Sequence, residues 1–189
     1  MTPAPRLLTF GHGTAEVPDL VARLTGAGVE AVVDVRTAPG SRRNPGMSRQ
    51  NLADRLPEAG IGYRWEPRLG GWRPVAADSP DIVWRNDSFR GYAAHARTPE
   101  FVAAVDDLLH EAAEHTTAVM CAESVWWRCH RRLIADFAVL ARDVQVGHLM
   151  PDGRLQPHHP TPGARLTPER LLVYDDRAAG EAGREDVKE

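Results

Sequence analysis

Two cysteines with charged neighbours are the residues best suited to chemistry in this chain, and they lie in Cys121-Ala122-Glu123 and Arg128-Cys129-His130-Arg131. Cys121 follows a short apolar run, and the second motif opens a segment with helical periodicity. The positive end of a helix and nearby arginines lower the pKa of a thiol, and a thiolate is a nucleophile. We therefore predict Cys121 as the catalytic nucleophile, with His12 or Glu123 as the general acid or base.

Arginine side chains gather near the same predicted site. The segment from Arg36 to Arg49 carries four arginines and no acidic residue, and further arginines follow at the helix start. The planar guanidinium group holds phosphate well, so an anionic small molecule or a nucleic acid is the expected partner. The spacing between Cys121 and Arg128 does not match the cysteine phosphatases, so the reaction stays open. The predicted substrate-binding residues are Thr14, Asp34, Arg36, Arg42, Arg128 and Arg131.

The cysteines and several histidines also allow a metal site, because thiolate and imidazole are ligands of zinc and iron. Their spacing matches no standard zinc finger, so the cofactor stays open, with iron or zinc as the alternatives. Besides a cysteine-dependent enzyme and a metal protein, a third hypothesis is a non-catalytic nucleic-acid-binding module, in which loop tryptophans such as Trp72 stack on bases. The candidate metal ligands are Cys121, His130, His12, Cys129 and His158.

The chain has 189 residues, 42% of them hydrophobic, and a formal net charge of -3. Of its 26 acidic and 23 basic residues, six and three lie in 175–189, which leaves 20 of each in 1–174. The length suits one globular domain, and the composition of the body excludes fibrous and disordered classes. We predict a single α/β domain over 1–174 and a disordered acidic tail over 175–189.

The expected location is the cytoplasm. No apolar run is long enough to cross a membrane, and the first residues lack the hydrophobic core of a signal peptide. We therefore expect no membrane partner, and the sequence identifies no protein partner. Cysteines in the cytoplasm are kept reduced, so Cys121 and Cys129 are predicted to be thiols rather than a disulfide.

Short apolar runs alternate with longer amphipathic stretches, as in an α/β domain. The predicted strands cover 7–10, 31–35, 61–65, 117–120 and 144–149, and the helices 20–27, 48–60, 98–115 and 129–142. Residues 66–86 are predicted as a long loop, and 151–174 as irregular with a short strand at 171–174. The alternation predicts a Rossmann-like fold, with a mostly parallel sheet of five strands or slightly more and helices on both faces.

Each strong polar cluster lies at the end of a predicted strand. Gly11-His12-Gly13-Thr14 follows the first strand, Asp34-Val35-Arg36 ends the second, and Cys121-Ala122-Glu123 follows the fourth. The carboxyl ends of parallel strands meet at one edge of a sheet, where ligands bind in the crevice at a switch point. The three clusters are therefore expected to line one crevice.

These motifs resemble a bacterial family, domain of unknown function 488 (DUF488), over residues 7–174. The pairing of Cys121-Ala122-Glu123 with Trp127-Arg128-Cys129-His130-Arg131 is the most specific part of the resemblance. Gly13 and Arg132 depart from the family pattern, since serine is common at both positions. The resemblance implies an α/β sandwich with motif residues His12, Thr14, Asp34, Arg36, Cys121, Glu123, Arg128, Cys129, His130 and His158.

Overall fold

The computed structural model describes residues 6–40 and 44–175. Its centre is a six-stranded sheet in the order β3-β2-β4-β1-β5-β6, with the first five strands parallel and β6 antiparallel to β5. A separate antiparallel pair joins β7 to β8. The predicted α/β fold with a mostly parallel sheet is confirmed. The strands are β1 (Leu7–Gly11), β2 (Ala31–Asp34), β3 (Gly62–Trp65), β4 (Thr117–Cys121), β5 (Val146–Leu149), β6 (Leu155–Pro157), β7 (Ala164–Leu166) and β8 (Leu172–Tyr174).

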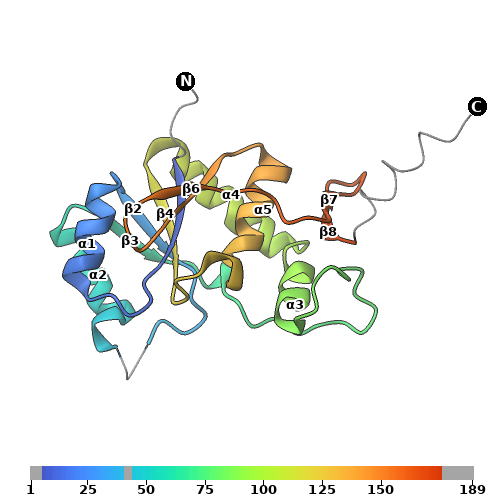
Figure 1. Ribbon diagram of the computed structural model, residues 1–189, viewed down its shortest axis with the longest axis horizontal. Helices are drawn as coiled ribbons and strands as arrows, with labels where there is room; N and C mark the ends of the chain where they lie inside the picture. The colour runs from blue at the N-terminus through green and yellow to red at the C-terminus, as the bar shows by residue number, and fades with distance from the viewer. Residues whose placement is uncertain (1–5, 41–43, 176–189) are drawn as a thin grey trace, which may run out of the picture.

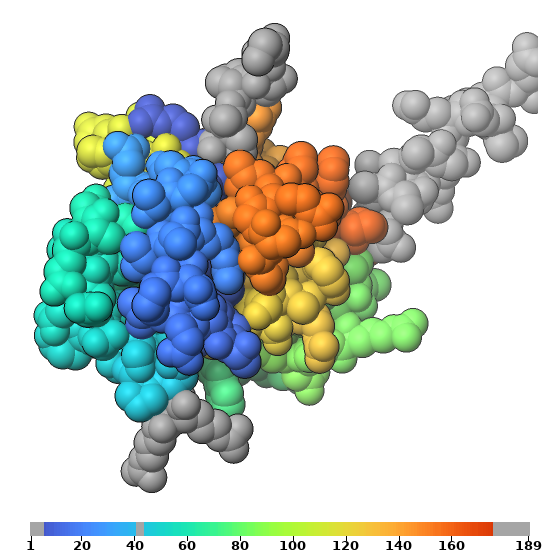
Figure 2. All heavy atoms as spheres, turned by 60° about the vertical axis from the view of Figure 1, so that its left-hand side comes forward, coloured from blue at the N-terminus to red at the C-terminus, as the bar shows by residue number. Residues whose placement is uncertain are grey.

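Helices cover both faces of the sheet, as Figure 1 shows. On one face lie α1 (Val17–Gly26) and α2 (Arg49–Glu58), which are side by side in Figure 2. The other face carries α4 (Pro99–Glu114) and α5 (Arg131–Arg142), and the short α3 (Asp87–His95) contacts β8. Three single 3-10 turns complete the elements: η1 (Pro45–Met47), η2 (Pro67–Leu69) and η3 (Trp126–Arg128).

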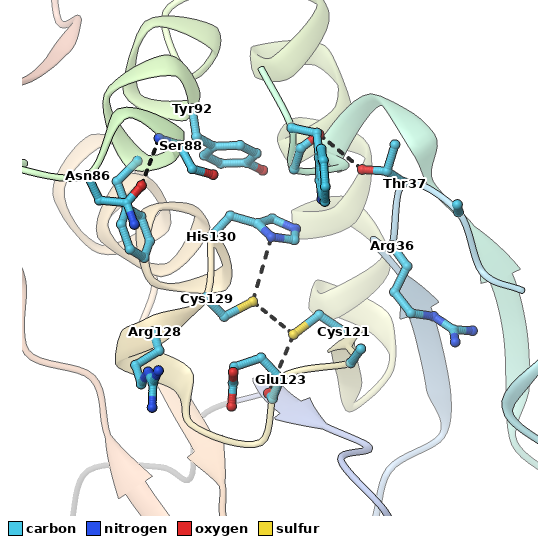
Figure 3. A pocket seen from close by; sticks show the side chains of 15 residues that line it. Arg36, Thr37, Asn86, Ser88, Tyr92, Cys121, Glu123, Arg128, Cys129 and His130 are labelled. Carbon is cyan, nitrogen blue, oxygen red and sulfur yellow. Dashed lines mark hydrogen bonds between the residues drawn. The ribbon is translucent and has the colours of Figure 1, made fainter. Parts of the chain in front are cut away.

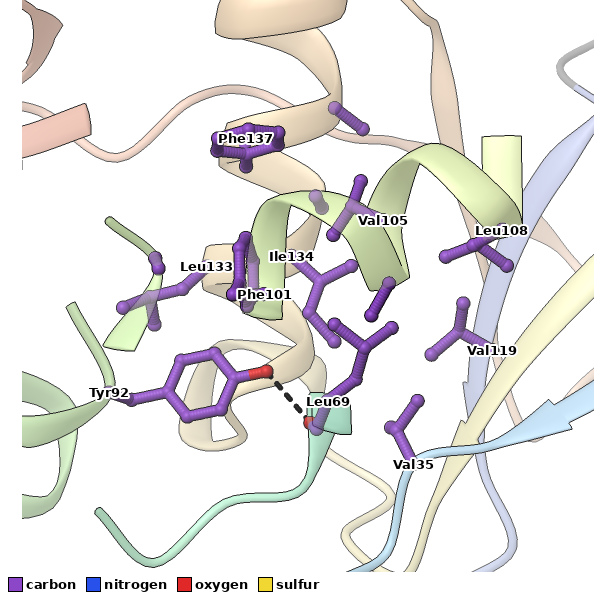
Figure 4. Packing of buried hydrophobic residues seen from close by; sticks show 14 of the residues in the cluster. Val35, Leu69, Tyr92, Phe101, Val105, Leu108, Val119, Leu133, Ile134 and Phe137 are labelled. Atoms are coloured by element: carbon purple, nitrogen blue, oxygen red, sulfur yellow. Dashed lines mark hydrogen bonds between the residues drawn. The ribbon is translucent and has the colours of Figure 1, made fainter. Parts of the chain in front are cut away.

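Alternation along the strands separates two hydrophobic cores. In β1, Leu8 and Phe10 pack with α1 and α2, whereas Leu7 packs with α4 and α5. Figure 4 shows the second core, where Phe101 of α4 meets Phe137 of α5 with ring centroids 5.3 Å apart. Odd-numbered residues of β1 therefore face α4 and α5, and even-numbered residues face α1 and α2.

Side-chain caps begin three of the helices. Ser48 and Thr98 each accept a hydrogen bond from the backbone N–H three residues later, and Asn86 accepts one from the N–H two residues later. Such caps satisfy backbone donors that have no partner inside the helix. The predicted starts of α2 and α4 are confirmed, whereas α3 was not predicted.

Besides the unpredicted α3, two parts of the chain differ from the prediction. The helix expected from 129 begins at Arg131, because Trp126–Arg128 forms the separate turn η3. Strands β6 and β7 lie in the stretch predicted as irregular. Each has three residues, none of them buried, so neither has a run of buried apolar residues that would predict a strand. Apart from Asp175, the predicted acidic tail lies outside the described residues. None of the described helices has the length and apolarity needed to span a membrane.

The strand order creates a switch point at β4. After β1 and β2 the chain crosses the face that carries α1 and α2, whereas after β4 it crosses the opposite face through α5. Since β4 lies between β1 and β2, the loop that follows β4 and the loops that follow its two neighbours lead to opposite faces of the sheet. A crevice for a ligand is expected at such a point, and Cys121 is the last residue of β4.

Candidate active site

A pocket of about 700 Å³ opens at the carboxyl end of β4. Figure 3 shows its walls, which come from four segments far apart in the sequence. Residues 36–38 follow β2, Gly71 and Trp72 belong to the loop after β3, and residues 86–92 include the start of α3. The floor is formed by residues 121–123 and 128–130. The pocket contains both cysteines and Arg36, whereas the predicted cluster at residues 11–14 does not line it.

The two cysteine sulfurs lie against each other at the floor of this pocket. Cys121 Sγ and Cys129 Sγ are 2.8 Å apart, and both residues are buried free thiols. Cys129 comes next to His130, whose Nδ1 lies 3.6 Å from Cys129 Sγ. The seven residues between the cysteines turn back over η3, so the strand end and the start of α5 bring the two thiols together.

Arg131 holds a positive charge beneath the thiol pair. Its Nε donates to Cys121 Sγ at 2.9 Å, and Nη2 donates to the carbonyl oxygen of Glu123. Burial alone would raise the pKa of Cys129, but the hydrogen bond from Cys121 and the charges of His130 and Arg131 lower it well below the ordinary value. Burial and the neighbouring Cys129 sulfur raise the pKa of Cys121. Of the two thiols, Cys129 is therefore the one that loses its proton more readily.

A chain of buried hydrogen bonds continues from Arg131 across the sheet. Arg131 Nη1 donates to Thr9 Oγ1 at 3.2 Å, and the Thr9 hydroxyl donates to His148 Nδ1 at 2.7 Å. His148 Nε2 then donates to His158 Nδ1, and His158 Nε2 donates to Asp136 Oδ1, both at 2.9 Å. In this direction every donor has one acceptor, and the chain ends at the Asp136 carboxylate, which accepts the N–H of His158 Nε2.

Two further features hold this chain in position. The strand register pairs Thr9 with His148, so both side chains point to the face of α5. Trp126 from η3 stacks on the ring of His148 with centroids 4.0 Å apart, which links the cysteine-bearing loop to β5. Burial, with the charges of His158 and Arg131, lowers the pKa of His148 to about 3. His148 is therefore neutral at physiological pH.

A second polar cluster surrounds Asp34 at the end of β2. Arg36 donates to both carboxylate oxygens of Asp34, with the closest pair at 2.6 Å, and Tyr63 donates to the same carboxylate at 2.7 Å. Arg36 Nη1 also donates to His12 Nε2 at 3.3 Å, while His12 Nδ1 donates to the carbonyl oxygen of Gly13. Burial and the charge of Arg36 lower the pKa of His12. The Arg36 charge is thus largely balanced by Asp34.

Arg128 is the cation of the pocket with the most freedom to meet a ligand. It is exposed, and among the residues that the structure describes no carboxylate forms an ion pair with it. Glu123 lies across the floor, with Oε1 accepting from the N–H of Val125 at 3.0 Å. Opposite them, Trp72 is 90% exposed at the rim and adopts φ 63°, a left-handed conformation that a large side chain rarely takes. Such strain is concentrated at functional sites.

Close backbone packing lets these segments meet. A Cβ on Gly11 would lie 1.8 Å from the carbonyl oxygen of Glu123, and a Cβ on Gly71 would lie 3.1 Å from His130 Nδ1. Gly13 has φ 54°, and a Cβ there would lie 2.1 Å from Ser124 Oγ. A serine at this position would therefore require Ser124 to rotate away.

The predicted site residues fall into distinct groups in the structure. The pocket is lined by Cys121, Glu123, Cys129, His130, Arg36 and Arg128. The network beneath it contains Arg131 and His158, whereas His12 and Asp34 lie with Arg36 on the side of α1 and α2. Thr14 is exposed and does not line the pocket, and Arg42 lies outside the described residues.

The candidate metal ligands do not lie together, because two of the histidines are separated from the cysteines. His12 lies beside Arg36, and His158 lies between His148 and Asp136, so neither imidazole joins the cysteines. Within 6–40 and 44–175, no group of three or more histidine, cysteine, aspartate or glutamate side chains is arranged to hold a metal ion.

Sequence reasoning missed most of one wall of the pocket. Asn86, Ser88, Phe89 and Tyr92 come from α3 and its cap, and Thr37 donates to the carbonyl oxygen of Gly71 at 3.0 Å. The cap at Asn86 is the signal that could have predicted α3. No local pattern indicates that this helix packs over the cysteines, where the Tyr92 ring lies 4.9 Å from the ring of His130.

Comparison with known proteins gives a family but no activity. No curated protein and no solved structure matches the chain. The model of the family described as "Domain of unknown function DUF488" matches residues 16–138, which include the pocket segments and the first part of α5. The match is shorter than the predicted resemblance over 7–174, and leaves His12, Thr14 and His158 outside it. The match covers more than half of the chain, which therefore belongs to the DUF488 family.

Proposed function

We propose that this protein is a cysteine-dependent enzyme, a hydrolase or transferase, that acts on a phosphate-bearing substrate, a nucleotide or a nucleic-acid fragment. One observation carries the proposal: two thiols in contact with each other and with Arg131 form the floor of a pocket that is also lined by Arg128, which forms no ion pair with a carboxylate of the described residues. Thiolates in electropositive, partly accessible surroundings are nucleophilic. We place the enzyme in the cytoplasm, where both thiols stay reduced.

Each group of the pocket has a role in this proposal. Arg128 binds the phosphate, for which its planar fork of N–H donors is suited. The exposed ring of Trp72 stacks on the base. We assign the attacking sulfur to Cys129 rather than to the sequence-predicted Cys121, because the pKa of Cys129 is lowered whereas that of Cys121 is raised. Glu123 moves a proton to or from the substrate, since its side chain lines the same floor. His12 instead positions Arg36.

The binding half of the proposal is tested by calorimetric titration of nucleoside monophosphates and of the matching nucleosides. The phosphate group should increase affinity, and Arg128→Gln should weaken monophosphate binding at least about tenfold while leaving nucleoside binding unchanged. Arg154→Gln is the matched control, because Arg154 is 84% exposed, pairs with Asp152 and lies outside the pocket. Equal affinity for nucleosides and monophosphates would overturn the proposal.

The chemical half is tested by alkylation with iodoacetamide, followed by mass spectrometry of the peptides. Alkylation at pH 7.5 should occur at Cys129 and should slow when a bound monophosphate fills the pocket. Thiols that resist alkylation at this pH, or that react equally fast with the pocket occupied, would remove the proposed nucleophile.

A further inference from the structure

We propose that Cys121 and Cys129 form a redox-active pair, which gives this pocket a second activity: thiol–disulfide exchange with small external disulfides. The activity concerns the sulfurs alone and does not depend on a phosphate-bearing substrate. It therefore goes beyond the proposed function.

The distance between the sulfurs carries the inference. At 2.8 Å they are closer than packed apolar groups come, and a disulfide bond of about 2.05 Å requires an approach of only about 0.8 Å. The chain contains two cysteines, and both are in this pair. Two cysteines buried only as small apolar groups would have no need of this contact or of the Arg131 guanidinium at 2.9 Å.

The pocket gives a small disulfide access to one sulfur while the other is held back. Both cysteines line the pocket, and the Phe89 and Tyr92 rings belong to the same lining. Cys121 is anchored from below by Arg131 Nε, whereas Cys129 faces His130 Nδ1 at 3.6 Å. Cys129 is therefore the attacking sulfur, and Cys121 is the sulfur that completes the exchange.

The exchange balances in two steps. Cys129 thiolate attacks one sulfur of the external disulfide R–S–S–R, which forms a mixed disulfide and releases one R–S⁻. Cys121 then loses its proton and attacks the Cys129 sulfur, which forms the protein disulfide and releases the second R–S⁻. Both released thiolates take up a proton, one from Cys121 and one from the solvent, so the pair loses two electrons and the Cys121 proton, and one R–S–S–R becomes two R–SH.

The test uses bis(2-hydroxyethyl) disulfide, a neutral probe, so that anion binding by Arg128 plays no part. The reduced full-length protein should lose the mass of two hydrogens and release two equivalents of 2-mercaptoethanol. Any disulfide within one chain must join Cys121 to Cys129. Mass spectrometry of the intact protein separates this product from a disulfide between two chains.

Single variants distinguish the two sulfurs. Cys121→Ser should accumulate the mixed disulfide at Cys129, whereas the wild type should resolve it at least about a hundredfold faster, because the second thiol is already in place. Cys129→Ser should form a mixed disulfide much more slowly. Near-ultraviolet circular dichroism checks that each variant is folded. If a variant does not fold, the loss of two hydrogens by the wild-type protein still tests whether the disulfide forms.

Two outcomes would overturn the inference: a wild-type protein that keeps both thiols under excess probe, or one that stops at the mixed disulfide. Neither outcome bears on nucleotide binding, which is measured without an oxidant. Conversely, a protein that binds no nucleotide but forms the disulfide would refute the proposed function and support the redox pair.

Discussion

Replacing Thr9 by valine tests whether the buried hydrogen-bond chain holds Arg131 in place. Thr9 is 1% exposed in the middle of β1, and its hydroxyl joins Arg131 Nη1 at 3.2 Å to His148 Nδ1 at 2.7 Å. Valine has nearly the same shape and suits a strand, so the change removes both hydrogen bonds without opening a cavity.

The expected loss follows from the two groups that are left without a partner. One is an N–H of a buried guanidinium, and the other is a buried imidazole nitrogen. Each such group costs about 1–3 kcal/mol, and the charged one lies toward the upper end. We expect Thr9→Val to lower the free energy of unfolding by about 3 kcal/mol. In a chain of this size, that loss lowers Tm by roughly 6–12 °C.

Urea denaturation at pH 7.5, followed by circular dichroism, measures this loss. Thr9→Ser keeps the hydroxyl and should lose about 1 kcal/mol or less, the value of one buried methyl group. Thr25→Val, at an exposed position on α1, should change stability by no more than about 0.5 kcal/mol. A loss below about 1 kcal/mol for Thr9→Val, with an unchanged denaturant slope, would refute the idea that the network constrains Arg131.

Two further changes test the surroundings of the thiol pair. The pKa of His148 is about 3 in the folded protein against 6.5 ordinarily, so the native state binds fewer protons and stability falls as pH drops below 6.5. Between pH 7.5 and 5 this residue should account for a loss of about 2 kcal/mol in urea denaturation. His148→Gln should remove that part of the pH dependence, whereas His110→Gln, at an exposed site on α4, should keep it. Gly11→Ala should lower the free energy of unfolding by more than about 2 kcal/mol, because its Cβ would collide with the Glu123 carbonyl. Gly26→Ala meets nothing within 4 Å and should raise the free energy of unfolding by about 0.5 kcal/mol, so equal thermal midpoints for these two variants would contradict the packing argument.

The fold was predictable where the sequence has strong local signals. Caps at Ser48 and Thr98 and all five parallel strands follow from residue type and period, and four of these strands are buried along their whole length. The helix α3 has nine residues and contains Gly91, where a Cβ would lie 2.1 Å from the Arg73 carbonyl. The need for that glycine comes from a tertiary crossing, which no local pattern reveals.

The sequence predicted which strand ends carry the polar residues, but it did not predict on which face of the sheet each side chain lies. The carboxyl ends of β1, β2 and β4 do meet, as the parallel topology requires. Alternation, however, places Cys121 with Val119 on the face of α4 and α5, whereas His12 continues the Leu8–Phe10 side toward α1 and α2. Counting alternate residues from each core would have separated His12 from the thiols. No comparable rule places Trp72 at the rim, since its loop has no period.

The energetics of Arg131 argue that the network serves the thiol pair rather than the fold. A buried charge adds little net stability even when paired, because desolvation offsets the Coulomb attraction, and apolar residues of similar volume often serve as well. Arg36 shows the ordinary arrangement, since its charge is neutralised by Asp34 at 2.6 Å. Arg131 is 1% exposed, yet its donors meet a sulfur, a hydroxyl and a carbonyl oxygen. With no carboxylate among these partners, its charge is left for the sulfurs, and packing alone would be met by an aliphatic side chain.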